Sequence, residues 1–482
     1  MSILAIDAGT TGVTVLVVSE NGEVVSRGYQ EFEQHFPKPG WVEHQPEQIW
    51  QATLTACGQA LAGFPHIDAI GITNQRETLV LWDRETLVSP RNAIVWQDRR
   101  TSDIVEELKQ HQEMVRAKTG TSLDPYFTST KLVWIQRNEP EIWETVKDGK
   151  TAIGTVDSYL VARLTAGTSH ITDASNASRT QLCNIDTANW DDELLELFDV
   201  PRSALPTIVA NFGQLAATDP DAFLGIDAPI TGMAGDQQAA LFGQAAFNAG
   251  DSKCTYGTGA FLLANTGTKR VASKNGLITT IAWMAPSGEI TYALEGSVFV
   301  AGSAVQWLRD GLKIIKEAKD VEALANQVDS SDGVVFVPAL TGLGAPYWKP
   351  DVRGTIFGIT RGTTDAHIAR ATLEAVAFQV TDLVRAMEED LGTAINTLRV
   401  DGGMSQNNLL MQLQSNALGV DVERGKVLES TALGAAYLAG LGAGIFSSEN
   451  SLQGVWSLDR EFRPNQNVTD LSLWHYALGR II

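Results

Sequence analysis

The chain has 482 residues, of which 44% are hydrophobic and 19% are charged. This balance is typical of a protein that buries a core, and the length predicts two domains or more. Acidic residues outnumber basic ones by 57 to 36, which gives a net charge of −21. A diffuse negative field disfavours nucleic acid and anionic lipid as partners, so an anionic substrate would need a locally built site. The three cysteines (Cys57, Cys183 and Cys254) are far apart, which argues against a disulfide framework or a thiolate zinc site.

Two segments of the sequence indicate whether the protein is secreted or inserted in a membrane. Residues 1–7 lack the basic region and the long apolar stretch of a secretory signal. The most apolar run, residues 431–446, contains four glycines and is short for a bilayer span. We therefore predict a tightly packed buried helix in this run, no membrane contact, and a cytoplasmic protein.

The first part of the chain alternates strands with helices. An apolar strand ends near residue 6, a Gly/Thr turn follows at residues 7–12, and a second strand covers residues 13–18. Asn21-Gly22 is a strong hairpin signal. A helical pattern then runs from Pro46 to about Leu61, before a short strand at residues 69–73. Such alternation predicts an α/β architecture.

A weak internal repeat suggests two similar domains. The opening strand–turn–strand pattern recurs at residues 253–263, where Gly257, Thr258 and Gly259 form the turn. Two such hairpins, one in each half, would let two domains face each other across a cleft. We place the boundary so that the domains cover residues 1–246 and 247–482. Chance similarity between short Gly/Thr turns is the competing interpretation.

Several common catalytic motifs are missing from the sequence. It contains no GxxxxGK[ST] phosphate loop, no GxGxxG that opens a βαβ unit, no GxSxG and no HExxH. The seven histidines are dispersed. The acidic and glycine-rich turns that remain indicate nucleotide phosphate and magnesium handled without a P-loop.

Two aspartates lie at the ends of predicted strands. Asp7 precedes the turn that holds Thr10 and Thr11; a carboxylate there can hold hydrated Mg²⁺, and glycine and threonine can donate to phosphate. Asp236 lies between an apolar strand and a helix that follows Gln237 and Gln238, where it could act as a general base. The alternatives are a plain hairpin turn with an incidental acid, and an N-cap aspartate.

Two further segments could contact a ligand. Asp401-Gly402-Gly403 separates a strand from a helix expected at residues 404–418, and would let a base or ribose approach the backbone. Arg76 and Glu77, with Trp96 further on, offer donors, acceptors and an apolar face to a small polyhydroxylated substrate. The alternatives are a glycine-rich connection and a solvated surface pair.

Long stretches of the chain resemble the FGGY carbohydrate kinases. The two most extended matches are YFTSTKLVWIQRN at 126–138, and GTIFGI at 354–359 with its continuation at 367–374. Within that family the chain looks like the members that phosphorylate glycerol, because of NQRET at 74–78, NAIVWQD at 92–98, AGDQQAALFG at 234–243, YGTG at 256–259 and DGG at 401–403. The likeness covers residues 3 to about 446.

The resemblance implies an α/β protein of the actin and sugar-kinase type, with two ribonuclease-H-like domains flanking a catalytic cleft. It also implies ATP-dependent phosphorylation of a terminal glycerol hydroxyl, with Asp236 as the base and Asp7 and Asp236 as partners of Mg²⁺. Residues expected to contact glycerol are Arg76, Glu77, Trp96, Tyr126, Asp236, Gln237 and Phe261. Residues expected to contact the nucleotide are Thr10, Thr11, Thr258, Gly302, Gln306, Gly403 and Asn407. We expect a homo-oligomer, a dimer or a tetramer.

The chain departs from the family pattern at two positions. Ala8 replaces a glutamine, and Thr14 replaces an arginine whose charge would strengthen phosphate binding. Two rival functions follow: a kinase for another short polyol, such as erythritol or dihydroxyacetone, and a non-catalytic regulator that binds nucleotide or polyol. Thr14 favours the regulator, whereas the retained Asp7 and Asp236 favour catalysis.

Overall fold

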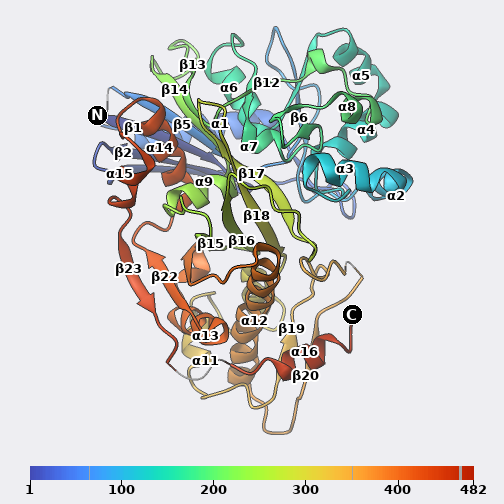
Figure 1. The fold of residues 1–482 in the computed structure, drawn as a ribbon, viewed down its shortest axis with the longest axis vertical. Helices are drawn as coiled ribbons and strands as arrows, with labels where there is room; N and C mark the ends of the chain where they lie inside the picture. Colours follow the sequence, from blue (N-terminus) through green and yellow to red (C-terminus); the bar gives the residue numbers. More distant parts are fainter. Residues whose placement is uncertain (65, 350, 466–468) are drawn as a thin grey trace.

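Two mixed β-sheets organise the computed structural model, which describes residues 1–64, 66–349, 351–465 and 469–482 (Figure 1). The first sheet has the order β13-β14-β5-β1-β2-β3, and the second has the order β17-β18-β16-β15-β21-β22-β23. The first sheet lies in the upper half of the view, and the second extends from the centre into the lower half. The α/β class expected from the sequence is therefore confirmed.

The first sheet is built around the predicted N-terminal hairpin. Its strand β1 pairs antiparallel with β2 and parallel with β5. Apolar residues of helix α1 pack against β2 and β3. The strands are β1 (Ser2–Ala8), β2 (Gly12–Ser19), β3 (Val24–Glu31), β5 (Ala69–Asn74), β13 (Phe212–Ala217) and β14 (Pro229–Gly235), and α1 spans Pro46–Ala60.

The second sheet repeats this core. Strand β15 pairs antiparallel with β16 and parallel with β21, just as β1 pairs with β2 and β5, so the predicted second hairpin is confirmed. The strands are β15 (Ser252–Tyr256), β16 (Ala260–Gly267), β17 (Ile278–Met284), β18 (Ile290–Val298), β21 (Thr397–Asp401), β22 (Asp421–Gly425) and β23 (Leu458–Phe462). The long helix α12 (Asp365–Leu391) and α13 (Asn408–Leu418) pack against one another.

Helix α14 (Ser430–Gly442) comes from the second half of the chain but packs on the first sheet and on α9 (Asp236–Gly243) (Figure 1). The two helices approach so closely that a Cβ on Gly434 would lie 1.8 Å from the carbonyl oxygen of Ala239, and one on Gly243 would lie 2.1 Å from that of Ser430. Only glycine permits such contact. The predicted buried helix is confirmed here. It connects the two halves by packing against α9, the helix that begins with Asp236.

Residues 75–211 form an outer segment attached to the first sheet, at the upper right of Figure 1. Its strands are β6 (Val80–Asp83), β7 (Ala93–Ile94), β8 (Thr151–Gly154), β9 (Ile171–Asp173), β10 (Cys183–Asn184), β11 (Asn189–Trp190) and β12 (Thr207–Val209). Its helices are α2 (Ser102–Leu108), α3 (Gln112–Thr119), α4 (Thr128–Asn138), α5 (Pro140–Lys147), α6 (Val156–Leu164), α7 (Ala174–Ala177) and α8 (Asp192–Leu197). The segment matters because it supplies one wall of the site described below.

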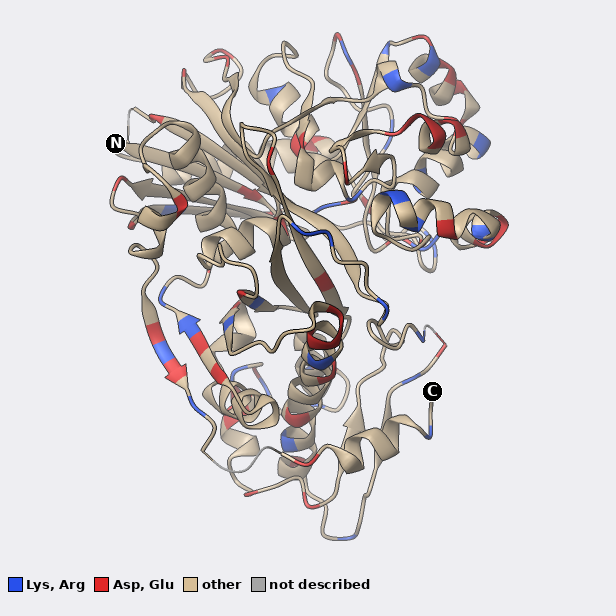
Figure 2. Cartoon of the chain, in the orientation of Figure 1, with Lys and Arg blue, Asp and Glu red and all other residues tan. Residues whose placement is uncertain are grey.

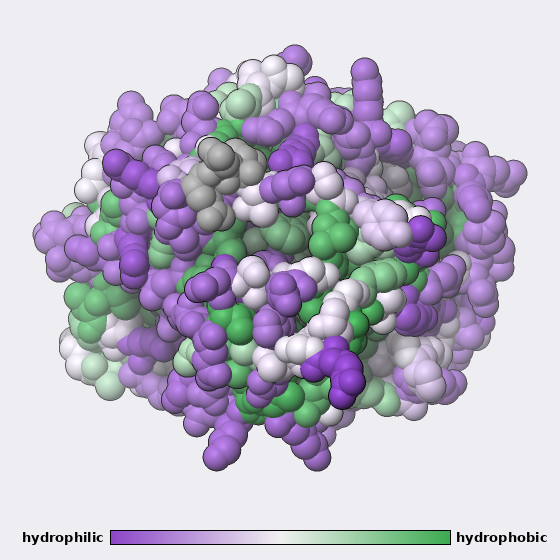
Figure 3. Space-filling view, turned by 90° about the horizontal axis from the view of Figure 1, so that it is seen from below, coloured by the Kyte–Doolittle hydropathy of each residue, from purple (hydrophilic) through white to green (hydrophobic). Residues whose placement is uncertain are grey.

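The remaining elements are β4 (Glu43–His44), α10 (Gly302–Asp310), α11 (Asp320–Ala325), β19 (Val335–Val337), β20 (Thr355–Phe357), α15 (Glu449–Gln453) and α16 (Ser472–Leu478). Charged residues gather on the outer helices and loops, whereas the central strands are mostly uncharged (Figure 2). On the face seen from below, hydrophobic residues are interspersed among more numerous hydrophilic ones (Figure 3). Among the described residues, no helix is long and apolar enough to cross a membrane.

Candidate active site

Two neighbouring cavities mark the candidate site, and the larger one lies between the two halves of the molecule. The large cavity has a volume of about 860 Å³. From the first half of the chain it is lined by the β1–β2 turn, the outer segment and the start of α9. From the second half it is lined by the β15–β16 hairpin and residues 299–306. The small cavity, about 460 Å³, is lined by residues of the second half. Thr258 and Gln306 line both cavities, so a ligand in one can reach a ligand in the other.

The structure brings the predicted site residues together around these cavities. The large cavity is lined by Thr10, Thr11, Arg76, Glu77, Trp96, Tyr126, Asp236, Gln237, Thr258, Phe261 and Gln306. The small cavity is lined by Thr258, Gly302, Gln306, Gly403 and Asn407. Asp7 is not among the lining residues of either cavity; it lies on β1, beside Thr14 of β2.

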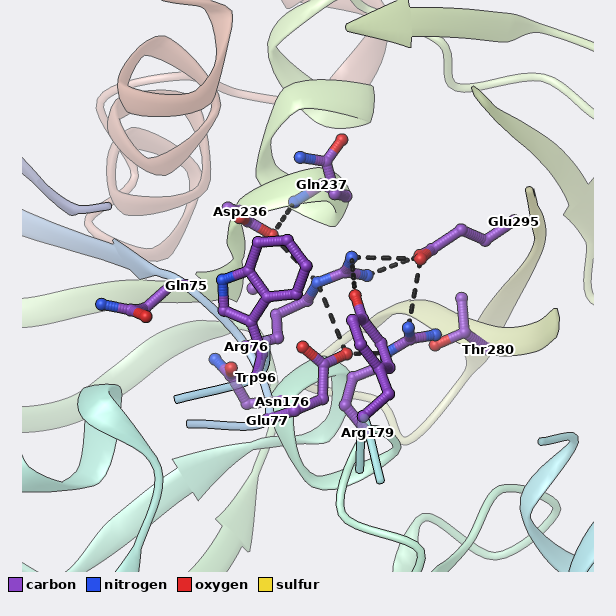
Figure 4. A network of polar contacts seen from close by, with 12 residues as sticks. Gln75, Arg76, Glu77, Trp96, Asn176, Arg179, Asp236, Gln237, Thr280 and Glu295 are labelled. Atoms are coloured by element: carbon purple, nitrogen blue, oxygen red, sulfur yellow. Dashed lines mark hydrogen bonds and ion pairs between the residues drawn. The ribbon is translucent and has the colours of Figure 1, made fainter. Parts of the chain in front are cut away.

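Arg76 is the centre of a buried network of charges (Figure 4). Its Nε lies 2.9 Å from Oδ1 of Asp236, and its Nη1 and Nη2 lie 2.5 Å and 3.1 Å from the two carboxylate oxygens of Glu295. Arg76 is 2% exposed and Glu77 is 1% exposed. The alternative that this pair forms a solvated surface is therefore wrong, and Arg76 links the proposed base to the second sheet.

The network continues through Arg179, which the sequence did not single out. Its Nε donates to Oε1 of Glu77 at 2.6 Å, and its Nη2 donates to Oε1 of Glu295 at 3.1 Å. Arg179 follows α7, and Glu295 lies in β18. A charged residue inside an otherwise apolar strand is the sequence signal that could have identified Glu295, because such a residue is almost never fully buried unless it is paired.

The protonation of the acids reflects this environment. Burial raises the pKa of Asp236, while Arg76 and the N–H of Gln237 oppose that rise and Glu295 adds to it. Burial, and then the charge of Asp236, raises the pKa of Asp7 to about 8. Burial alone would raise the pKa of Glu295 as well, but the charges of Arg179 and Arg76 outweigh it and lower that pKa to about 2. Glu295 is thus a fixed anion, and Asp236 is the more basic carboxylate.

Two buried lysines hold the neighbouring groups in place. Lys253, fully buried in β15, donates to the side-chain oxygen of Gln237 at 2.5 Å. Since lysine only donates, it fixes the amide of Gln237 with its NH₂ available to a ligand. Lys131, in α4, donates to the backbone carbonyls of Glu77 at 3.0 Å and Tyr126 at 2.7 Å. Neither lysine was predicted, because neither lies in a turn.

Aromatic rings form the apolar wall of the large cavity. The ring of Trp96 lies edge-on to Tyr126 and to Phe261, with centroids 5.6 Å and 6.3 Å apart. The indole N–H of Trp96 donates to Oγ1 of Thr10 at 3.0 Å. Trp96 therefore connects the apolar wall to the β1–β2 turn, and Phe261 closes the wall from the second half.

The small cavity owes its shape mainly to the backbone around a few glycines. A Cβ on Gly302 would lie 2.6 Å from the carbonyl oxygen of Gly257, and Gly402 has a φ of +83°. The helix expected from residue 404 begins instead at Asn408, because a 3₁₀ turn (Gly403–Gln406) precedes it and Asn407 caps α13 by accepting from the N–H of Leu410 at 2.9 Å. The predicted start of this helix was therefore wrong.

The acids of the site fit a magnesium ion better than a metal that needs three or more protein side chains as ligands. Among the described residues there is no group of three or more His, Cys, Asp or Glu side chains placed to hold a metal. Mg²⁺ keeps most of its waters and needs only one or two carboxylates. The charge of Asp236 raises the pKa of Asp7, and a divalent cation held by these two residues would offset that charge.

Two sheets of the same core topology, with a hairpin from each facing a shared cleft that holds a half-buried acid, define a two-domain phosphotransferase of the actin-like class. Residues 2–243 match the N-terminal domain of the FGGY family of carbohydrate kinases, and residues 252–443 match its C-terminal domain. The chain belongs to the FGGY family of carbohydrate kinases.

Known proteins support this membership and confirm the predicted two-domain fold. The chain is 52% identical to a glycerol kinase of Bdellovibrio bacteriovorus over 99% of both chains, and 53% identical to one of a Geobacillus species over 96% of this chain and 94% of that one. It matches the crystal structure of Plasmodium falciparum glycerol kinase with ADP at a TM-score of 0.92 and 38% identity, covering 100% of this chain and 98% of that one. A gluconate kinase from Lactobacillus acidophilus shares the fold at a TM-score of 0.86 and 23% identity, covering 96% of this chain and 94% of that one.

Proposed function

We propose that the protein transfers the γ-phosphate of ATP to a terminal hydroxyl of glycerol, forming glycerol 3-phosphate and ADP. The observation that carries this proposal is Asp236 in the large cavity, held by Arg76 at 2.9 Å and placed at the start of α9. The identity of about 50% to glycerol kinases over nearly the whole chain supports the choice of glycerol.

Glycerol would bind among the charged and aromatic groups of the large cavity. Arg76 and the amide of Gln237 offer donors, and Glu77 offers an acceptor, for neighbouring hydroxyls. Trp96 and Phe261 would cover the carbon side. A site built to pair with each hydroxyl of a three-carbon polyol rejects analogues that leave its buried groups unpaired.

Asp236 would take the proton of the attacking hydroxyl. Its raised pKa brings its basicity closer to neutral pH, where a general base is most effective. Phosphoryl transfer otherwise depends on positioning and on neutralising charge. Thr10 and Thr11 from one hairpin and Thr258 from the other would donate to the phosphates across the cleft. Mg²⁺, held through water by Asp7 and Asp236, would supply the remaining positive charge.

The nucleotide would occupy the small cavity. Gly302, Gln306, Gly403 and Asn407 line it, and Thr258 marks its junction with the large cavity. The related Plasmodium falciparum glycerol kinase was crystallised with ADP, which supports ATP as the phosphate donor. A cytoplasmic location, a homo-oligomeric state and the division of the chain at residue 247 remain predictions from the sequence.

One assay tests the proposal and its rivals. ADP release is measured with glycerol, dihydroxyacetone and erythritol, with a reaction lacking any polyol as the control. We expect kcat/KM to be highest for glycerol. A higher kcat/KM for either other polyol would assign a different acceptor, and no polyol-dependent ADP release would favour the non-catalytic regulator.

A further inference from the structure

We propose that Glu295 is a positioning residue for this reaction: it holds the two Nη groups of Arg76, so that the guanidinium group faces Asp236 with its Nε side as an ion pair, and it thereby leaves the Asp236 carboxylate free to accept the proton of the acceptor. This inference rests on the proposed function and adds to it a residue of the second sheet. Glu295 is fully buried in β18, whereas Arg76 follows β5 of the first sheet.

The first argument is the geometry of the guanidinium group. Both carboxylate oxygens of Glu295 are taken up by Nη1 and Nη2 of Arg76, at 2.5 Å and 3.1 Å. Nη1 also donates to the side chain of Gln238 at 3.2 Å. The paired edge of the fork therefore points at Glu295, and Nε faces Asp236 in an ion pair without a hydrogen bond, 2.9 Å from its Oδ1 (Figure 4).

The second argument is the state of the Asp236 carboxylate. Within the described part of the chain, its contacts with Arg76 Nε and with the N–H of Gln237, at 2.7 Å, both fall on Oδ1. Oδ2 is thus the oxygen that can meet an acceptor hydroxyl. If Glu295 did not occupy the paired edge, Arg76 could turn that edge to Asp236, since arginine binds carboxylates most strongly in a two-bonded arrangement.

The third argument is the balance of charge. Glu77, Arg179, Glu295, Arg76 and Asp236 alternate in sign along the network. Arg179 holds Glu295 from the other side and so keeps it in place between the two arginines. Removing the negative charge of Glu295 would leave both arginines partly uncompensated, and Arg76 would then be free to turn its paired edge toward Asp236.

The test compares four proteins: the wild type, Glu295→Gln, Glu295→Asp and the control Glu289→Gln, which removes an exposed acid just before β18. kcat and KM for glycerol are measured for all four proteins. We expect Glu295→Gln to lower kcat at least tenfold, by more than it raises KM. Glu289→Gln should match the wild type.

Glu295→Asp separates the charge from its position. It keeps the negative charge but draws the oxygens back by one methylene group, so we expect a kcat between those of the wild type and Glu295→Gln. A wild-type kcat in Glu295→Gln would overturn the proposal. If that variant does not fold, Glu295→Asp decides, and a kcat within twofold of the wild type overturns it. Absence of glycerol-dependent turnover in the wild type would instead refute the proposed function.

Discussion

The two cavities are built on different principles. In the large cavity, fully buried side chains from both sheets hold one another through charges: Arg76 and Arg179 meet Glu295 across the cleft. In the small cavity, glycines of local turns shape the backbone, and the lining residues that carry a charge are Lys319 and Glu322. Fixed charges orient a small uncharged acceptor and a base, whereas glycines let a larger ligand approach the backbone. Substitutions should therefore act more strongly in the large cavity.

Breaking the charge network should have the largest effect. Arg76→Met leaves Glu295 and Asp236 without their shared cation, and the loss of one partner from a buried ion pair costs about 3–5 kcal/mol. We expect urea unfolding to show that loss, together with a fall of kcat/KM for glycerol of at least about 100-fold, which corresponds to about 2.7 kcal/mol. Arg99→Met is the control, because Arg99 lines the same cavity but pairs with Asp124 near the surface, where a pair contributes about 0–1 kcal/mol. Equal losses of stability and of kcat/KM in Arg76→Met and Arg99→Met would contradict the special role of the buried charges in the large cavity.

Asp7 should make folding depend on pH. Its pKa is raised from its ordinary value to about 8 by burial and by Asp236, so the metal-free protein loses stability as pH rises from about 4 through 8. Each pKa unit corresponds to about 1.4 kcal/mol. Asp7→Asn cannot ionise and should escape this loss, which makes it the more stable protein at pH 8.5 by a few kcal/mol. Urea unfolding in EDTA at pH 5.5 and 8.5 measures the difference. Mg²⁺ should reduce this difference in stability. If the stabilities of the wild type and Asp7→Asn changed in parallel with pH, Asp7 would not be the group responsible.

Phe261 should set the size of the acceptor. Phe261→Ala removes the part of the apolar wall that faces Trp96, and contact with one methylene group in such a pocket contributes about 1–3 kcal/mol. We expect about a tenfold higher KM for glycerol and a smaller preference for glycerol over erythritol. Phe299→Ala serves as the control, since Phe299 lines the same cavity but packs against Trp348. An unchanged ratio of kcat/KM for the two polyols in Phe261→Ala would rule out this role.

Thr14 should have the smallest effect. It pairs with Asp7 on one side and Tyr29 on the other, so its side chain shares the face of the sheet that carries Asp7. A charged hydrogen bond contributes about 1.5–3 kcal/mol against about 1 for a neutral one, so Thr14→Arg should tighten ADP binding several-fold and less so at high salt. Thr14→Val is the uncharged control, because it keeps the shape of the side chain and removes only its hydroxyl group. Calorimetric titration of ADP at two ionic strengths decides, and equal or weaker binding by Thr14→Arg would mean that no cation is needed there.

The sequence predicted lining residues of both cavities but missed the charged partners around Arg76, and the reason is physical. Gly403 lies in a glycine-rich turn, and Thr258 lies in a hairpin whose partner strands are adjacent in the chain, so local patterns reveal them. Glu295 pairs with Arg76 from 219 positions away in the chain, and Arg179 pairs with Glu77 from 102 positions away. Their pairing depends on how the outer segment and β18 pack together, which no local pattern encodes. Packing similarly places α14 on the first sheet.

Turnover and glycerol binding by Asp236→Asn, measured on the same preparation, test the central claim most directly. The claim is that Asp236 removes the proton while the rest of the large cavity holds the acceptor. Removing a general base typically lowers the rate about 10²–10⁴-fold, whereas the side chain of asparagine fills nearly the same space. We predict a fall of kcat in that range, with glycerol binding still measurable by calorimetry. A kcat close to that of the wild type would contradict the account.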